Sequence, residues 1–182
     1  MADIMLDLET AGTSTNAVIL TFGAIKFDPH STDEPGPGIY FRVNVDEQTA
    51  LGREIDQSTM DWWMQQREEV REEAFAEEDR LPIINFTKEI NRFVVGANNI
   101  WAQGPVFDIP IIESLYKQLG IPVPWQYWQV RDSRTVFGLK PNLRIKDNSA
   151  HNALVDCYTQ AKSIQAIYQH FGIIKEKYQP TK

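Results

Sequence analysis

Two carboxylates, Asp7 and Glu9, lie two residues apart in an apolar stretch near the start of the chain. The apolar residues of this stretch, 4–8, predict a buried strand. Side chains alternate along a strand, so residues i and i+2 point to the same face. Two like charges about 4 Å apart repel by roughly 4 kcal/mol at an effective dielectric constant near 20. A fold tolerates such a pair when one carboxylate keeps its proton or when a cation lies between the two. The simpler alternative is a strand that ends in solvent with both acids exposed.

Two more acids and a histidine follow at the starts of apolar, helix-like stretches. Asp108 comes after a short strand-like segment and before apolar residues at helical spacing. Asp156 begins a second such stretch, five residues after His151. Each has a plain alternative, because Asp108 could only cap its helix and His151 could be a packed or surface histidine. In an α/β sheet, however, the ends of such elements gather at one edge, where ligands bind.

Four acids at one edge suit two divalent cations of the Mg²⁺ class, which prefer oxygen ligands. Two such ions about 3.5–4 Å apart clamp a phosphodiester, one activating water and the other stabilising the leaving oxygen. A histidine supplies a group near neutral pKa that accepts the proton of that water. The pattern therefore favours a metal-dependent phosphodiester hydrolase.

The composition is that of a globular chain with one hydrophobic core. It has 182 residues, 42% of them hydrophobic and 24% charged. A net charge of -7 argues against a protein that coats nucleic acid generally, but an enzyme whose metal ions supply the local positive charge is still possible. The single cysteine, Cys157, excludes an internal disulfide and favours a reducing compartment. The first residues show no signal peptide and no run is long enough to span a membrane, so we expect a cytoplasmic protein without membrane contact.

Five strands and four main helices are expected. Strands over 4–10, 18–27 and 39–45 with short connections predict an antiparallel meander. Two shorter strands are expected at 99–103 and 128–132, and helices near 58–64, 83–93, 109–119 and 154–171. The Glu- and Arg-rich segment 67–80 is expected to be a solvated face or a connection, and the segment after 132 a basic loop.

The motif set resembles the DEDDh-type 3′→5′ exonucleases of the DnaQ-like superfamily. Residues 7–10 match its first motif, Asp-x-Glu-Thr, and Phe107-Asp108 match its second. Residues 151–157 match its third, His-x-Ala-x-x-Asp-Ala, with Cys157 in place of the usual small residue. Residues 60–63, 120–125 and 131–135 resemble a phage and prophage subgroup, exodeoxyribonuclease VIII-like, which in turn resembles a mycobacterial-type exoribonuclease. The resemblance extends over nearly the whole chain, roughly residues 2–171.

The resemblance implies a fold and a set of roles. The fold is α/β and ribonuclease H-like, a mixed five-stranded sheet of a meander plus parallel strands flanked by helices, in a single domain over 1–174 with a polar tail over 175–182. Two divalent cations, Mg²⁺ or Mn²⁺, would be bound by Asp7, Glu9, Asp108 and Asp156, with Asp7 bridging both ions. His151 would be the general base. The enzyme would release nucleoside 5′-monophosphates in a bacterial cell, encoded by a phage or prophage, and a homodimer is possible.

The expected substrate contacts are Leu8, Thr10, Phe107, Trp63, Arg144 and Lys146. The backbone of residues 8–10 holds the terminal nucleotide in the resembled family. Phe107 could stack on a base or belong to the core. Adjacent helical residues cannot both face the core squarely, so one tryptophan of 62–63 is expected to pack and the other, taken here as Trp63, to contact substrate. The basic segment 131–146 is expected to bind phosphates upstream of the scissile bond, unless it is a solubilising loop.

The choice between DNA and RNA stays open, because the contacts that read the 2′-hydroxyl cannot be identified from one sequence. The phage subgroup favours single-stranded DNA or 3′ overhangs, with a 3′→5′ exoribonuclease as the alternative. A non-catalytic nucleic-acid-binding module would be favoured by a missing carboxylate, yet all four acids and His151 are present. A structural Ca²⁺-binding or simple acidic domain leaves the spacing of His151 and Asp156 without an explanation.

Overall fold

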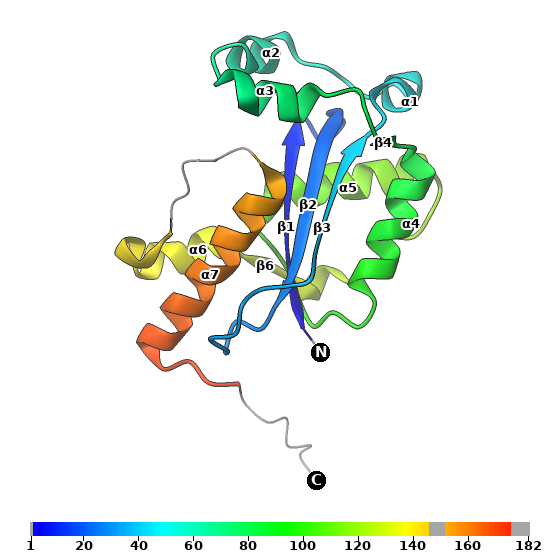
Figure 1. Ribbon diagram of the computed structural model, residues 1–182. Helices are drawn as coiled ribbons and strands as arrows, with labels where there is room; N and C mark the ends of the chain where they lie inside the picture. The colour runs from blue at the N-terminus through cyan, green and yellow to red at the C-terminus, as the bar shows by residue number, and fades with distance from the viewer. Residues whose placement is uncertain (1, 146–151, 176–182) are drawn as a thin grey trace.

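The computed structural model describes residues 2–145 and 152–175, and its centre is a six-stranded mixed sheet in the order β4-β3-β2-β1-β5-β6 (Figure 1). The antiparallel meander joins the first three strands, while β5 lies parallel to β1, β6 parallel to β5 and β4 parallel to β3. The strands are β1 (Asp3–Thr10), β2 (Ile19–Phe27), β3 (Gly38–Val43), β4 (Arg80–Leu81), β5 (Ile100–Ala102) and β6 (Val130–Asp132).

The mixed α/β sheet is confirmed, with one strand more than predicted. All five predicted strands are present, and the sixth is the two-residue edge strand β4. Two residues are too few to show the alternation on which a strand prediction depends. The side chain of Arg80 also donates hydrogen bonds to the carbonyl oxygens of Leu20, Val43 and Ala74. Side-chain contacts therefore stabilise this edge strand in addition to its backbone pairing with β3.

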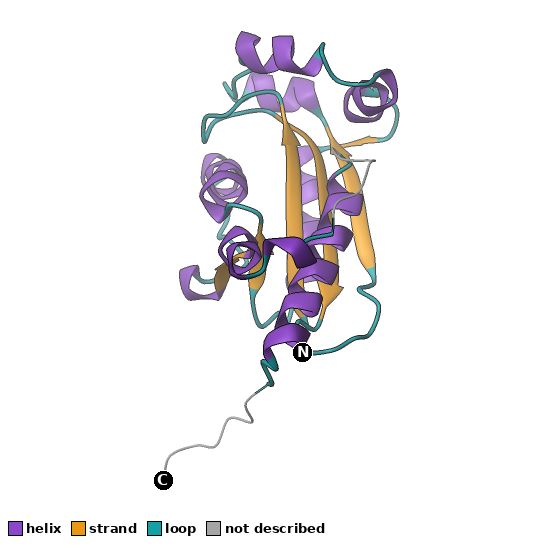
Figure 2. Cartoon of the chain, turned by 90° about the vertical axis from the view of Figure 1, so that its left-hand side faces the viewer, coloured by secondary structure: helices purple, strands orange, loops and turns teal. Residues whose placement is uncertain are grey.

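Seven α-helices are described in the parts of the chain given above, and they cover both faces of the sheet (Figure 2). None of them is long and apolar enough to traverse a lipid bilayer. They are α1 (Val45–Ala50), α2 (Gln57–Trp63), α3 (Glu68–Phe75), α4 (Ile83–Val94), α5 (Pro105–Gln118), α6 (Ser133–Leu139) and α7 (Ala153–Phe171), with 3-10 turns at 127–129 and 141–143.

The segment after β6 is a helix where a loop was predicted. Asp132 is the N-cap of α6, and its carboxylate accepts hydrogen bonds from the backbone N–H of Arg134 and the hydroxyl of Thr135. This cap satisfies a backbone donor that the first turn of a helix leaves unpaired. The loop prediction gave weight to the basic residues of this segment and overlooked Asp132 as a helix N-cap.

The alternation of β1 decides which face of the sheet carries the acid pair. Ile4, Leu6 and Leu8 belong to the core that packs against α4 and α5. Met5 belongs to the core on the opposite face, together with residues of α6 and α7. Asp7 and Glu9 continue the Met5 side of the strand, so they face the start of α7.

Helix α7 begins in direct contact with β2. Gly23 pairs with Asp7 across β1 and β2, and a Cβ atom at Gly23 would lie 2.3 Å from the backbone carbon of Ala153. The thiol of Cys157 lies 3.3 Å from the carbonyl oxygen of Gly23, its hydrogen-bond acceptor. Only a residue without a side chain permits this approach, which brings the first turn of α7, with Asp156, beside Asp7.

Candidate active site

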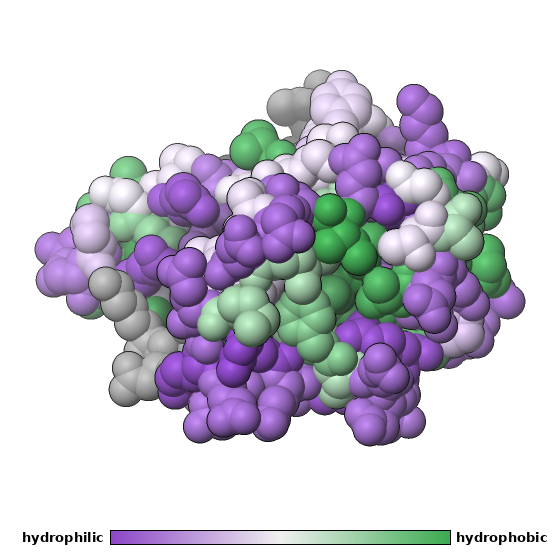
Figure 3. Space-filling view, turned by 90° about the horizontal axis from the view of Figure 1, so that it is seen from above, coloured by the Kyte–Doolittle hydropathy of each residue, from purple (hydrophilic) through white to green (hydrophobic). Residues whose placement is uncertain are grey.

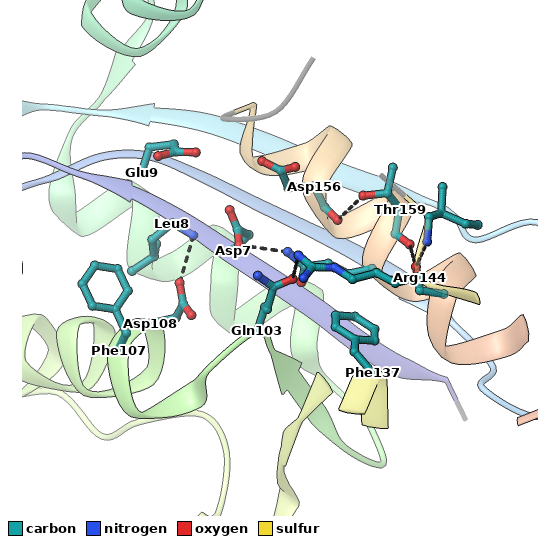
Figure 4. A pocket seen from close by; sticks show the side chains of 13 residues that line it. Asp7, Leu8, Glu9, Gln103, Phe107, Asp108, Phe137, Arg144, Asp156 and Thr159 are labelled. Atoms are coloured by element: carbon teal, nitrogen blue, oxygen red, sulfur yellow. Dashed lines mark hydrogen bonds between the residues drawn. The ribbon is translucent and has the colours of Figure 1, made fainter. Parts of the chain in front are cut away.

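Three of the predicted ligands form one compact cluster. One carboxylate oxygen from each of Asp7, Glu9 and Asp156 lies within 4.8 Å of the other two. Asp7 and Glu9 come from one face of β1, and Asp156 comes from the first turn of α7 (Figure 4). The acids of the strand and the acid at the helix start therefore lie close together, as predicted.

Asp108 reaches the same region from α5. It lies in the first turn of that helix, whose N-cap is Gly104, so Asp108 is not the capping residue. Its Oδ1 instead accepts a hydrogen bond from the backbone N–H of Leu8 at 3.2 Å. Leu8 is the residue between Asp7 and Glu9, and Figure 4 shows Asp108 across β1 from the three-acid cluster.

Burial makes this concentration of acids costly without a cation. Glu9 is 8% exposed and Asp108 is 3% exposed. Burial, followed by the charges of Asp156 and Asp108, raises the pKa of Glu9 to about 8, and burial raises the pKa of Asp108 to about 7. The pKa of Asp7 is raised well above its usual value, first by burial and then by the charges of Asp108, Glu9 and Asp156. Buried oxygen ligands that repel one another in the ionised form are the donor set that hard divalent cations stabilise.

The four acids share one cleft of about 500 Å³. Arg144 is an exposed residue that lines this cleft. Its guanidinium donates a hydrogen bond to Oε1 of Gln103 at 2.9 Å and lies 5.2 Å from the ring centre of Phe137. The lining residues are Asp7, Leu8, Glu9, Gln103, Phe107, Asp108, Phe137, Arg144, Ile145, Asp156, Thr159, Gln160 and Ser163.

A second cleft of about 410 Å³ adjoins the first and shares Leu8, Glu9 and Phe107 with it. The rest of its wall is formed by Thr10, Gly12, Thr13, Ser58, Thr59, Trp62 and Trp63. The hydroxyl of Thr10 donates to the carbonyl oxygen of Gly12 at 2.6 Å, which fixes the turn after β1. Phe107 is half-buried and lies between the two clefts, so it both packs on the core and remains accessible.

Of the two adjacent tryptophans, Trp63, the predicted substrate contact, is the buried one and Trp62 is the exposed one, and both line the second cleft. Trp63 is 1% exposed, and its Nε1–H donates to the carbonyl oxygen of Thr10 at 2.9 Å. Trp62 is 40% exposed and packs edge-to-face on Trp63, with ring centres 5.0 Å apart. Helices α2 and α3 lie at the top of Figure 1, and Figure 3, seen from above, shows apolar side chains among polar ones on this end of the molecule.

Two predicted site residues, His151 and Lys146, lie outside the described residues. Gln160 also lines the cleft and was not among the predicted site residues. Gln160 donates a hydrogen bond from Nε2 to Oδ1 of Asp7 at 3.2 Å. It follows Asp156 by four residues, and residues four apart share a face of a helix, so this spacing was the available signal.

The comparisons with known proteins decide the family. The family model of the 3′-5′ exoribonuclease Rv2179c-like domain matches residues 2–168. The chain belongs to this family. An exodeoxyribonuclease of Enterobacteria phage T4 is 27% identical over 161 residues, which is 74% of this chain and 70% of that protein.

Solved structures of exonucleases share this fold. The zinc-bound complex of E. coli exonuclease I with single-stranded DNA has a TM-score of 0.67 at 17% identity, covering 92% of this chain and 40% of that one. The nuclease domain of 3′hExo, a DEDDh family member bound to rAMP, has a TM-score of 0.61 at 13% identity, covering 97% of each chain. The predicted resemblance to DnaQ-like 3′→5′ exonucleases and the ribonuclease H-like fold are confirmed. The chain spans less than half the length of the exonuclease I chain.

Proposed function

We propose that this chain is a metal-dependent 3′→5′ exonuclease that removes nucleotides from the 3′ end of a single strand or overhang and releases nucleoside 5′-monophosphates. The observation that supports it most is the convergence of Asp7, Glu9 and Asp156 within 4.8 Å, with Asp108 tied to the backbone between the first two. Membership of the exoribonuclease family and the exonuclease relatives agree with this chemistry.

The acids would hold two divalent cations, Mg²⁺ or Mn²⁺. Asp7, Glu9 and Asp156 would hold an ion together, and Asp108, whose charge also acts on Asp7, would be the fourth ligand. When bound, the ions activate water and stabilise the charge that develops on the leaving oxygen. His151 would accept the proton of the attacking water, as its place in the third motif predicts.

The terminal nucleotide would occupy the second cleft. Its wall offers the rings of Phe107 and Trp62, and base stacking on an aromatic ring is worth about 1–3 kcal/mol for any base. The backbone of residues 8–10 runs between the two clefts, close to the acids. Arg144 is an exposed lining residue of the first cleft, and together with Lys146 it would bind phosphates of the preceding nucleotides.

Single-stranded DNA is the substrate that we favour. The phage T4 relative is named an exodeoxyribonuclease, and the exonuclease I structure holds single-stranded DNA. RNA is the second candidate, because the matched family is named for an exoribonuclease and the 3′hExo structure holds rAMP. An assembly of two identical chains is a further proposal, tested by the mass measured in light scattering.

A panel of 5′-labelled oligonucleotides tests the proposal. Single-stranded DNA, the matching RNA and duplexes with 3′ overhangs are incubated with Mg²⁺ or Mn²⁺. We expect a ladder that shortens from the 3′ end, fastest for single-stranded DNA, and no ladder with Asp156→Asn or with EDTA. If only the RNA is shortened, RNA replaces single-stranded DNA as the proposed substrate. Intact 3′ ends on every oligonucleotide would refute the proposed activity.

A further inference from the structure

Gln160 is a buried amide that faces the acid cluster. It lies one helical turn after Asp156 on α7, is 6% exposed and lines the same cleft as the acids. Its Nε2 lies 3.2 Å from Oδ1 of Asp7. An amide N–H that donates to a carboxylate favours the ionised form of that carboxylate. The hydrogen bond lowers the pKa of Asp7, against the effects of burial and the neighbouring acids that raise it.

The other end of the same amide has no partner. Oε1 of Gln160 is buried and accepts no hydrogen bond within the part of the chain that the structure describes. A buried acceptor without a donor costs about 1–3 kcal/mol, so such atoms are rare in native proteins unless a water or ligand serves them. The cleft beside Gln160 is polar and large enough for a water molecule.

These two observations define a role next to the cation site. A carboxylate that binds a cation must keep both its rotamer and its charge, and outer hydrogen bonds to metal ligands commonly fix both. The Nε2–H group donates to Asp7, which contributes an oxygen to the cluster with Glu9 and Asp156. Oε1 is an acceptor suited to a water molecule carried by a bound cation, since such waters are strong donors.

We propose that Gln160 is a positioning residue that holds the Asp7 carboxylate in its metal-binding orientation through Nε2 and accepts a hydrogen bond from a cation-bound water through Oε1. This inference rests on the proposed function, since it assigns Asp7 to a cation. Gln160 is not a catalytic residue, because it acts through Asp7.

The chain contains a matched control on the same helix. Gln165 is also buried, its Nε2 donates to the backbone carbonyl oxygens of Asp28 and Asp33, and its Oε1 likewise has no partner among the described residues. Gln165 does not line the cleft of the acids. Gln160→Met and Gln165→Met therefore remove the same amide from the same helix, and only the first removes it from the acid cluster.

The experiment measures Mn²⁺ binding to the metal-free full chain by calorimetry, with the melting temperature of each variant recorded in EDTA. Loss of an outer hydrogen bond to a metal ligand typically weakens metal binding 10–100-fold, so we expect Gln160→Met to bind Mn²⁺ about 10-fold more weakly. Gln165→Met should keep the wild-type affinity. Gln160→Ala provides a second variant if the methionine side chain disturbs folding, and it should weaken binding to a similar extent.

Unchanged Mn²⁺ affinity in both Gln160 variants would overturn the inference, as would an equal loss in Gln165→Met. A wild-type chain that binds Mn²⁺ but leaves every 3′ end intact would overturn the proposed function alone, and the affinities would still decide the role of Gln160. A wild-type chain that binds no Mn²⁺ would overturn both.

Discussion

The backbone N–H of Leu8 donates a hydrogen bond to Oδ1 of Asp108, 100 residues later in the chain, at 3.2 Å. This hydrogen bond joins Asp108 of α5 to Leu8, the residue between Asp7 and Glu9 on β1. Asp108 is thereby a structural partner of β1 as well as a candidate metal ligand. The two roles can be separated because an asparagine oxygen accepts the same hydrogen bond without the charge.

Asp108→Asn should keep the fold and lose most of the activity. The amide oxygen can still accept from Leu8 N–H, while the negative charge is gone. Asp108→Ala should in addition lower the free energy of unfolding by about 1–3 kcal/mol, because the buried N–H loses its acceptor. Urea unfolding and the oligonucleotide ladder, run on both variants, check the prediction. Equal stability of the two variants would show that the Leu8 contact contributes little.

The metal-free chain should become less stable as pH rises. Glu9, with its pKa raised from 4.5 to about 8, and Asp108, raised from 3.8 to about 7, hold protons in the folded state that the unfolded chain has already released. Their stabilising contribution is complete below the unfolded pKa values and disappears as pH passes through 7 to 8. Urea unfolding in EDTA between about pH 5 and pH 9 should show this decline, and Glu9→Gln should reduce its slope.

Divalent cations should reverse that trend. Ions held by the ionised carboxylates of the folded chain should stabilise it most at the alkaline end of the series. The same unfolding series with excess Mg²⁺ measures the gain. A stability profile that is flat in EDTA, or indifferent to Mg²⁺ at alkaline pH, would contradict the electrostatic description of the site.

Trp62→Ala should weaken binding of single-stranded oligonucleotides by about 1–3 kcal/mol, the typical contribution of one stacked base. The measurement is fluorescence anisotropy with Ca²⁺ in place of Mg²⁺. Trp128→Ala is the matched control, because Trp128 is also an exposed tryptophan but lines neither cleft. Trp63→Ala should act differently, lowering the free energy of unfolding by about 3–5 kcal/mol through the loss of a buried ring. Equal binding losses at Trp62 and Trp128 would remove the stacking assignment.

Arg144→Gln should weaken binding to the same degree for all sequences and reduce the salt dependence of the binding constant by about one ion. The control is Arg92→Gln on α4, an exposed arginine paired with Glu89. The oligonucleotide affinity of both variants is measured from low to moderate salt, and only Arg144→Gln should show a reduced salt dependence. An unchanged salt slope for Arg144→Gln would mean that this residue contacts Gln103 and Phe137 but does not bind phosphate.

The sequence was sufficient for the residues whose positions follow from local geometry. The alternation of β1 places Asp7 and Glu9 on one face, and the two helix starts bring Asp108 and Asp156 to the same edge. The short strand β4 could not be predicted, since its pairing with β3 depends on tertiary contacts of Arg80.

Two site features depend on contacts between distant segments. Which tryptophan is buried is decided by Thr10, whose carbonyl oxygen accepts from Trp63, and by Phe75, whose ring centre lies 5.4 Å from that of Trp63. Neither contact leaves a pattern in residues 60–64. Gln160 belongs to no catalytic residue class, and only its spacing from Asp156 indicated the direction of its side chain.

The central claim is that the acids of β1, α5 and α7 together hold divalent cations. It is tested most directly by anomalous diffraction at the manganese edge, using crystals grown with Mn²⁺ and a nucleoside 5′-monophosphate. We predict anomalous density bounded by Asp7, Glu9, Asp108 and Asp156, with oxygen atoms of Asp7 among the ligands. Ordered nucleotide with no anomalous density among these four carboxylates would contradict the claim.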